Sequence, residues 1–271
     1  MNDTSYVHGY SSIESQRLSD QANTLSNLLH HDTIFQPPGL VLEAGCGIGA
    51  QTVIIAPQNP ACRFISIDIS EQSLAIAEKN IEKQNIRNVE FRTADVFNLP
   101  FNEESFDHLF ICFLLEHLPE PQKALLSLKK MLKKGGTITV IEGDHGSAYY
   151  HPRSEAAQAT IQCLIDVQAM MGGNSLIGRE LYPVLVKAGF DEISVSPRIV
   201  YADASRPAMV DGFTRKTFIS MVEGIREQAI DTGIITEADW DKGINELYRS
   251  ADIDGTFNYT FFKASAKKPV T

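Results

Sequence analysis

The feature that most constrains the fold is an alternation, between residues 40 and 142, of short apolar runs with segments of helical periodicity. Runs of this length, without polar alternation, are typical of strands buried on both faces. They cover residues 40–44, 64–67, 89–93, 106–113 and 137–142. Because parallel strands are joined by right-handed helical crossovers, the alternation of strand and helix segments predicts a doubly wound α/β fold with a mostly parallel sheet.

Two of the intervening segments show clear helix signals. Ser70 is placed to cap a helix that carries Leu74, Ala77 and Ile81 on one face. A second apolar stripe ends before the pair Gly135-Gly136, which is typical of a helix C-terminus. That stripe consists of Ala124, Leu125, Leu128, Met131 and Leu132.

Further segments flank this alternating region. Residues 11–30 predict an amphipathic helix, with Ser11 and Glu14 as a capping box and Leu18, Ala22, Leu25 and Leu29 on one face. We also expect helices over 154–171 and 178–188, strands over 193–200 and 256–264, and helices opening at Ser205-x-Pro207 and Thr236-x-x-Asp239. The chain should therefore comprise an N-terminal helical lid, residues 1–37, and a core, residues 38–271, with helical insertions at about 150–175 and 205–250.

Composition narrows the class of function. The chain has 271 residues, 43% of them hydrophobic, and a net charge of −10, so it should fold and should repel nucleic-acid phosphates. No apolar stretch approaches about 18 residues and the N-terminus carries no secretion signal, so we expect no membrane span and a cytoplasmic location. The four cysteines lack metal-ligand spacing, and we expect no metal site.

The first apolar run leads into a loop with closely spaced glycines, Gly45, Gly47 and Gly49. Such a loop lets backbone N–H groups approach a ligand at a strand-to-helix turn. Loops that bind a dinucleotide and loops that bind adenosylmethionine both need this feature. The glycines alone therefore leave the ligand open.

Acidic residues stand at the ends of the next strands. Asp68 lies 19 residues beyond Gly49, where a carboxylate can accept hydrogen bonds from ribose hydroxyls, or else cap the following helix. Asp95 could accept from an adenine amino group while Val96 packs on the ring; a turn or cap residue is the alternative. Phe113 and His117 follow the fourth strand in the crevice where open α/β sheets bind ligands, although His117 could also cap a turn.

Together these segments resemble class I S-adenosylmethionine-dependent methyltransferases over about residues 38–145, in order and with family spacing. The segments are Val41–Gly49, Ile67–Ser70, Ala94–Val96 with Leu99–Phe101, Phe106-Asp107 running to Glu116–Leu118, and Leu132–Gly136. The resemblance implies a seven-stranded sheet ordered 3-2-1-4-5-7-6, with S-adenosyl-L-methionine as cofactor.

The resemblance also assigns roles to individual residues. Glu43 would hold the loop or sense the cofactor's amino group, and Gly45, Gly47 and Gly49 would line its methionine part. Asp68 would bind the ribose beside Ile69 at the adenine. The full set of expected cofactor contacts is Glu43, Gly45, Gly47, Gly49, Asp68, Ile69, Asp95, Val96, Phe113, His117, Tyr10 and Arg17.

The acceptor is less constrained. Where amino-group methyltransferases carry an Asn/Asp-Pro-Pro-aromatic motif, this chain has Phe113-Leu114-Leu115-Glu116, and it more closely resembles small-molecule methyltransferases. Since the sulfonium is already activated, alignment and water exclusion are the main requirements. A general base helps a hydroxyl or an acidic carbon, and His145 is the candidate, ahead of Glu142 and Asp144; a hydrogen-bonded loop histidine is the alternative.

Two other functions remain to be weighed. A nicotinamide-dependent oxidoreductase shares the strand, glycine loop and distal acid, but this loop is Gly-x-Gly-x-Gly rather than Gly-x-Gly-x-x-Gly. A non-catalytic protein that binds adenosylmethionine would be expected to have a damaged cofactor motif, and every position here is intact. The sequence therefore predicts methyl transfer to a small-molecule acceptor.

Overall fold

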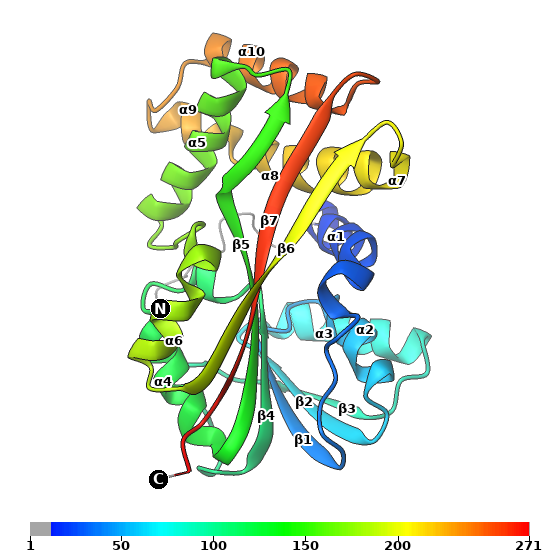
Figure 1. The fold of residues 1–271 in the computed structure, drawn as a ribbon, viewed down its shortest axis with the longest axis vertical. Helices are drawn as coiled ribbons and strands as arrows, with labels where there is room; N and C mark the ends of the chain where they lie inside the picture. The colour runs from blue at the N-terminus through cyan, green and yellow to red at the C-terminus, as the bar shows by residue number, and fades with distance from the viewer. Residues whose placement is uncertain (1–11, 271) are drawn as a thin grey trace. The chain divides into compact units, whose positions relative to one another are not determined.

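The computed structural model of the chain describes residues 12–270. Seven strands form one sheet in the order β3-β2-β1-β4-β5-β7-β6, which confirms the expected topology (Figure 1). They are β1 (Gly39–Ala44), β2 (Cys62–Asp68), β3 (Val89–Thr93), β4 (Phe106–Cys112), β5 (Leu132–His151), β6 (Asp191–Asp203) and β7 (Thr256–Lys267). The β1–β2, β2–β3, β1–β4 and β4–β5 pairs are all parallel, so the carboxyl ends of β1 to β4 meet at one edge.

The chain divides into two compact units. The first, here called the sheet unit, comprises Ser26–Gly143, Ile177–Arg198 and the described residues from Phe262 onward. The second, the insertion unit, comprises the described residues up to Leu25, Asp144–Leu176 and Ile199–Phe261. The sequence-based boundary at residue 37 stays a prediction.

In the sheet unit, helices cover both faces of the sheet, as expected of a doubly wound fold (Figure 1). α2 (Thr52–Gln58) and α3 (Glu71–Lys83) lie on one face, and α4 (Pro121–Met131) and α6 (Leu181–Lys187) on the other. Short 3-10 turns, η1 (Leu115–His117) and η2 (Ile177–Glu180), follow β4 and precede α6. The core between the sheet and α4 and α6 is apolar, with Leu109, Ile138, Leu128 and Leu185 fully buried.

Local signals account for the ends of these helices. Ser70 Oγ accepts the N–H of Ser73 at 3.1 Å, which confirms it as the cap of α3. The expectation that Leu132 belongs to α4 is wrong. The backbone turns extended there, and Leu132 begins β5 beside Phe106. Leu132 is fully buried in β5, and its apolar side chain continues the spacing of the helical stripe in the sequence.

The fifth strand is longer than expected. It continues past Glu142 to His151, so Asp144 and His145 lie within β5 rather than after it. Beyond Ile141 the strand consists mainly of small and polar residues, which form no continuous apolar run. The continuous apolar run that indicates a buried strand in the sequence therefore covers only part of β5.

Helices make up most of the insertion unit, confirming the helical insertions after β5 and β6. α5 (Glu155–Met170) packs on α10 (Glu237–Tyr248) so closely that a Cβ on Gly243 would lie 2.4 Å from the Thr160 side chain. The segment expected to open one helix at Ser205 instead forms several: α7 (Pro207–Met209), the π-helix η3 (Val210–Ile219), α8 (Ser220–Glu223) and α9 (Arg226–Asp231), with η4 (Arg249–Ala251) after α10. Thr236 Oγ1 accepts the Asp239 N–H at 3.2 Å and caps α10 as predicted.

Helix α1 (Ser12–His30) confirms the N-terminal amphipathic helix, with Ala22, Leu25 and Leu29 buried. The Ser11 half of the expected capping box lies outside the described residues. The Glu14 carboxylate accepts from Arg17, one turn further along the helix.

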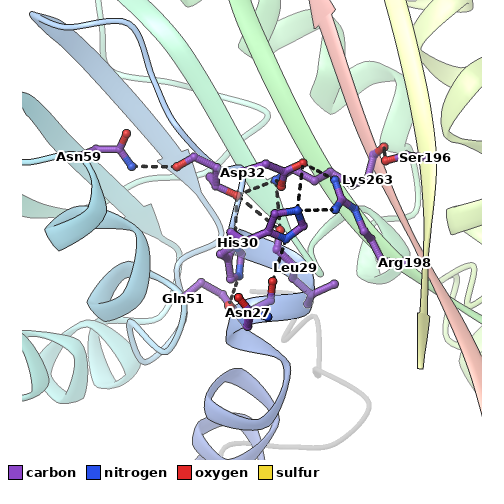
Figure 2. A network of polar contacts seen from close by, with 11 residues as sticks. Asn27, Leu29, His30, Asp32, Gln51, Asn59, Ser196, Arg198 and Lys263 are labelled. Carbon is purple, nitrogen blue, oxygen red and sulfur yellow. Dashed lines mark hydrogen bonds and ion pairs between the residues drawn. The ribbon is translucent and has the colours of Figure 1, made fainter. Parts of the chain in front are cut away.

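The C-terminal end of α1 is held by a polar network in the sheet unit (Figure 2). Nζ of Lys263, on β7, donates to the Leu29 carbonyl at 3.1 Å, to Asp32 Oδ1 at 2.6 Å and to Thr33 Oγ1 at 2.7 Å. Arg198, on β6, pairs with the other Asp32 oxygen. Burial would raise the pKa of Asp32, but hydrogen bonds from the two cations hold it at about 2. The Leu29 carbonyl, in the last turn of the helix, thus accepts from a buried ammonium.

We predict that Lys263→Met lowers the free energy of unfolding by about 2 kcal/mol, because it leaves Asp32 and the end of α1 without their shared donor. Lys267→Met on the same strand is the control. Its ion pair with Glu192 is exposed, so it should change stability by under about 0.5 kcal/mol. Urea denaturation of both variants measures the difference. Equal losses would contradict a special role for Lys263.

Candidate functional site

The glycine loop lies between β1 and α2, at the carboxyl edge of the sheet. Gly45, Gly47 and Gly49 have φ angles of +72°, +51° and +74°, a region that L side chains rarely adopt. The Gly45 and Cys46 N–H groups both donate to the Ile67 carbonyl, at 2.8 and 3.0 Å, so the loop docks on the end of β2. A Cβ on Gly47 would meet nothing within 4 Å, which leaves that side of the loop open to a ligand.

Asp68 ends β2 beside this loop. Its Oδ2 accepts the Gly47 N–H at 2.8 Å and its Oδ1 accepts the Ser70 N–H at 2.9 Å. The helix cap is Ser70, so the alternative in which Asp68 caps α3 is wrong. Each carboxylate oxygen has a further lone pair, which fits the predicted contact with two vicinal hydroxyls.

Glu43 lies deeper, at the end of β1. Its Oε2 accepts from Ser66 Oγ at 2.5 Å and from Thr52 Oγ1 at 2.8 Å, which joins β1, β2 and the start of α2. The pKa of Glu43 is raised to about 7. Burial is the main cause and Asp68 acts in the same direction, whereas the hydrogen bonds from Ser66 and Thr52 lower it. Of the two predicted roles, holding the loop has contacts in the structure; contact with an amino group stays a prediction.

The third strand end places the residues expected at the adenine. Asp95 Oδ1 accepts the Phe97 N–H at 2.9 Å, a local turn that fixes the carboxylate. Val96 is buried among the core residues, and the Ile69 side chain is 60% exposed. Their contacts with a base stay predictions.

The turn after β4 holds the remaining expected contacts. Phe113 adopts φ +57°, which a bulky side chain rarely does and which stores strain of about 1–2 kcal/mol. Its N–H donates to the Ile141 carbonyl at 2.9 Å. His117 Nε2 lies 3.6 Å from Glu116 Oε1, within an ion-pairing distance.

The lid residues are only partly described. Tyr10 lies outside the described residues. The Arg17 guanidinium is buried, donating to both Glu14 oxygens at 2.6 and 2.7 Å and to Gln21 Oε1 at 2.9 Å. Within α1 these three side chains form one polar group, and the predicted cofactor contact of Arg17 stays a prediction.

His145 belongs to the insertion unit, in the outer half of β5. Its Nδ1 lies 2.7 Å from Tyr259 Oη on β7, and both side chains are buried. The Phe218 ring lies edge-on to the imidazole, with 6.3 Å between ring centroids. A hydrogen-bonded phenol fixes the imidazole orientation, which a general base requires.

Other kinds of site find no support in the part of the chain that the structure describes. Residues 12–270 contain no cluster of three or more potential metal ligands. Among the same residues, no helix combines the length and apolarity needed to cross a bilayer.

A glycine loop docked on β2, an acid at each of the next strand ends and the 3-2-1-4-5-7-6 sheet define the class I methyltransferase fold. Residues 39–189 match the family model described as a methyltransferase domain. The chain belongs to this family of class I S-adenosylmethionine-dependent methyltransferases.

Individual relatives are more distant. An uncharacterised methyltransferase of Schizosaccharomyces pombe is 30% identical over 182 residues, covering 65% of this chain and 63% of the relative. A demethylmenaquinone methyltransferase of Lactobacillus johnsonii is 30% identical over 103 residues, covering 37% of this chain and 42% of the relative. The chain thus spans less than two thirds of these relatives. The crystal structure of the cyclase SpnF is similar in fold, with a TM-score of 0.57 and 19% identity, covering 93% of this chain and 82% of SpnF.

Sequence reasoning misses Ser66 and Thr52 and places Glu142 only among the candidate bases, although all three support the loop or the turn beside it. Ser66 and Thr52 hold Glu43, and Glu142 binds the turn after β4. Their partners are 9 to 28 residues away along the chain, so no local spacing marks them. Only the parallel register, which places the ends of β1, β2, β4 and β5 side by side, could have indicated them.

The loop is also tied to the end of α1. His30 Nε2 lies 2.7 Å from Oε1 of Gln51, two residues beyond Gly49, and its Nδ1 lies 3.3 Å from Thr33 Oγ1 (Figure 2). Since an amide oxygen only accepts, Nε2 carries a proton in this contact. Burial lowers the pKa of His30 to about 4, despite the hydrogen bond to Gln51.

This histidine predicts a pH-dependent stability. Because the unfolded imidazole titrates near 6.5 and the folded one near 4, the unfolded state binds more protons between these values. Stability should therefore fall as the pH drops from 6.5 towards 4, with about 2 kcal/mol lost from this group by pH 5. In His30→Gln that part of the slope should vanish in denaturation curves at pH 5 and 7. An unchanged slope, or the same flattening in the control His31→Gln, would contradict the assignment.

Proposed function

We propose that this protein transfers a methyl group from S-adenosylmethionine to a small-molecule acceptor by in-line displacement. The observation that carries the proposal is the pairing of Asp68 with the Gly47 N–H beside an open-sided glycine loop. A carboxylate fixed there can accept from the two ribose hydroxyls while the loop receives the methionine part. The bound cofactor would supply an activated methyl group on a sulfonium.

Residues of the chain would then contribute binding and orientation. Glu43 holds the start of the loop and Asp95 is fixed by its own turn, so both are preorganised before a ligand arrives. With the methyl group already activated, no acid catalyst is required. Proton removal matters only for acceptors such as hydroxyls or acidic carbons.

A small-molecule acceptor is supported by the net charge of −10, which disfavours nucleic acid, and by Phe113-Leu114-Leu115-Glu116 in place of an amine-positioning motif. The name of one relative, a demethylmenaquinone methyltransferase, supports including quinones among the acceptors to be tested. A screen for adenosylhomocysteine release across phenols, quinones, amines and carboxylates tests the acceptor class. Cofactor binding with no turnover on any of them would favour a non-catalytic binding protein.

Asp68→Ala should weaken adenosylmethionine binding by about 1–3 kcal/mol, the scale of a hydrogen bond to a charged group. Calorimetric titration measures the affinity. Asp107→Ala is the matched control, because Asp107 also accepts a backbone N–H, from Leu40, but at the opposite end of the sheet. Its variant should bind the cofactor as the wild type does. Unchanged affinity in Asp68→Ala would overturn the ribose assignment.

We further propose His145 as the general base. His145→Ala should reduce turnover by about 10²-fold or more, the usual scale of general-base catalysis, without changing cofactor affinity. His151→Ala, an exposed histidine on the same strand, should retain activity. If an identified acceptor were methylated by His145→Ala at the wild-type rate, the imidazole would have only a structural role.

A further inference from the structure

Glu142 is a fully buried carboxyl in the sheet unit, near the point where β5 leaves that unit. Its Oε1 accepts the N–H of Leu114 at 3.1 Å and that of Leu115 at 2.7 Å. These are the two residues after Phe113, where the backbone takes its left-handed turn. One side-chain oxygen thus satisfies two backbone donors of a strained turn.

The surroundings of Glu142 favour its uncharged form. Burial raises its pKa well above the usual range, and the Glu116 carboxyl on η1 acts in the same direction, against the opposing backbone hydrogen bonds. Burial raises the pKa of the Cys112 thiol on β4 as well. The carboxyls of Glu142, Glu43 and Glu116 raise it further, and the Lys263 ammonium opposes them. Burial and the neighbouring carboxyl both favour the uncharged form of Glu142.

The other oxygen supports the same protonation state. Oε2 of Glu142 is buried and has no hydrogen-bond partner among the residues described. Burying an unpaired hydroxyl costs a few kcal/mol, whereas burying a full unpaired charge costs far more. An amide of the same shape should therefore fit this position.

The turn held by Glu142 contacts the glycine loop directly. The Leu114 side chain lies against Gly45, and a Cβ at Gly45 would lie 2.7 Å from Leu114 Cδ1. The same leucine donates its N–H to Glu142. A path of two contacts thus runs from the carboxyl of Glu142 to the loop segment expected at the methionine part of the cofactor.

We propose that Glu142 is a positioning residue that holds the turn after β4 against Gly45 and so sets the affinity for the amino-acid portion of the methyl donor. This inference rests on the proposed function. It assigns Glu142 a role in cofactor binding, distinct from that of a base acting on the acceptor.

The test compares Glu142→Gln and Glu142→Ala by calorimetric titration with adenosylhomocysteine and with adenosine, which lacks the amino-acid portion. Glu142→Ala should weaken adenosylhomocysteine binding about tenfold or more, because the turn loses its acceptor, and should leave adenosine affinity within about twofold. Glu142→Gln keeps an uncharged oxygen that accepts the two backbone N–H groups, so it should retain adenosylhomocysteine affinity to within about threefold of the wild type.

Val140→Ala is the control for general destabilisation, because Val140 is fully buried on β5 two residues before Glu142 and its apolar side chain makes no hydrogen bond to the turn. It should bind both ligands as the wild type does. Equal losses for both ligands in Glu142→Ala, or a loss in Glu142→Gln as large as in Glu142→Ala, would overturn the proposal. A wild-type protein that binds neither ligand would instead refute the proposed function.

Discussion

The docking of the glycine loop on β2 is the contact on which the rest of the site depends. Two consecutive N–H groups, of Gly45 and Cys46, converge on the single carbonyl of Ile67, and this convergence requires the positive φ at Gly45. Once the loop is fixed, the next N–H, of Gly47, points to Asp68. The predicted ribose acid and the predicted methionine loop are therefore one hydrogen-bonded unit rather than two separate features.

Two buried carboxyls, Glu43 and Glu142, support the glycine loop and the turn beside it from the neighbouring strands. Glu43 joins β1 to β2 and α2 through two hydroxyls, and Glu142 joins β5 to the turn after β4 through two amides. Burial is the main cause of the raised pKa of each carboxyl, and the hydrogen bonds that hold each one come from uncharged groups. A low-charge support of this kind avoids the desolvation cost of a buried ion pair while keeping the geometry of hydrogen bonds.

The sequence predicted the parts of the fold that depend on local pattern. Strand–helix alternation gave the sheet class, Ser70 and Thr236 marked two helix starts, and the family resemblance supplied the strand order. The prediction from sequence failed where burial, and not hydrophobic periodicity, decides whether a segment is a helix or a strand. Leu132 is apolar in either a helix or a strand, and β5 continues through small and polar residues to His151. The support of Glu142 for the turn depends on contacts across the sheet, which no short motif can encode.

The residues proposed for cofactor binding and for proton removal fall in different compact units of the chain. Expected contacts at the loop and strand ends belong to the sheet unit, whereas His145 and its partner Tyr259 belong to the insertion unit. A fold-level likeness to the cyclase SpnF shows that this architecture is not confined to one reaction. Because the family match ends at residue 189, most of the insertion unit lies outside it. The residues that distinguish one acceptor from another should therefore be sought there, beginning with the buried His145–Tyr259 pair.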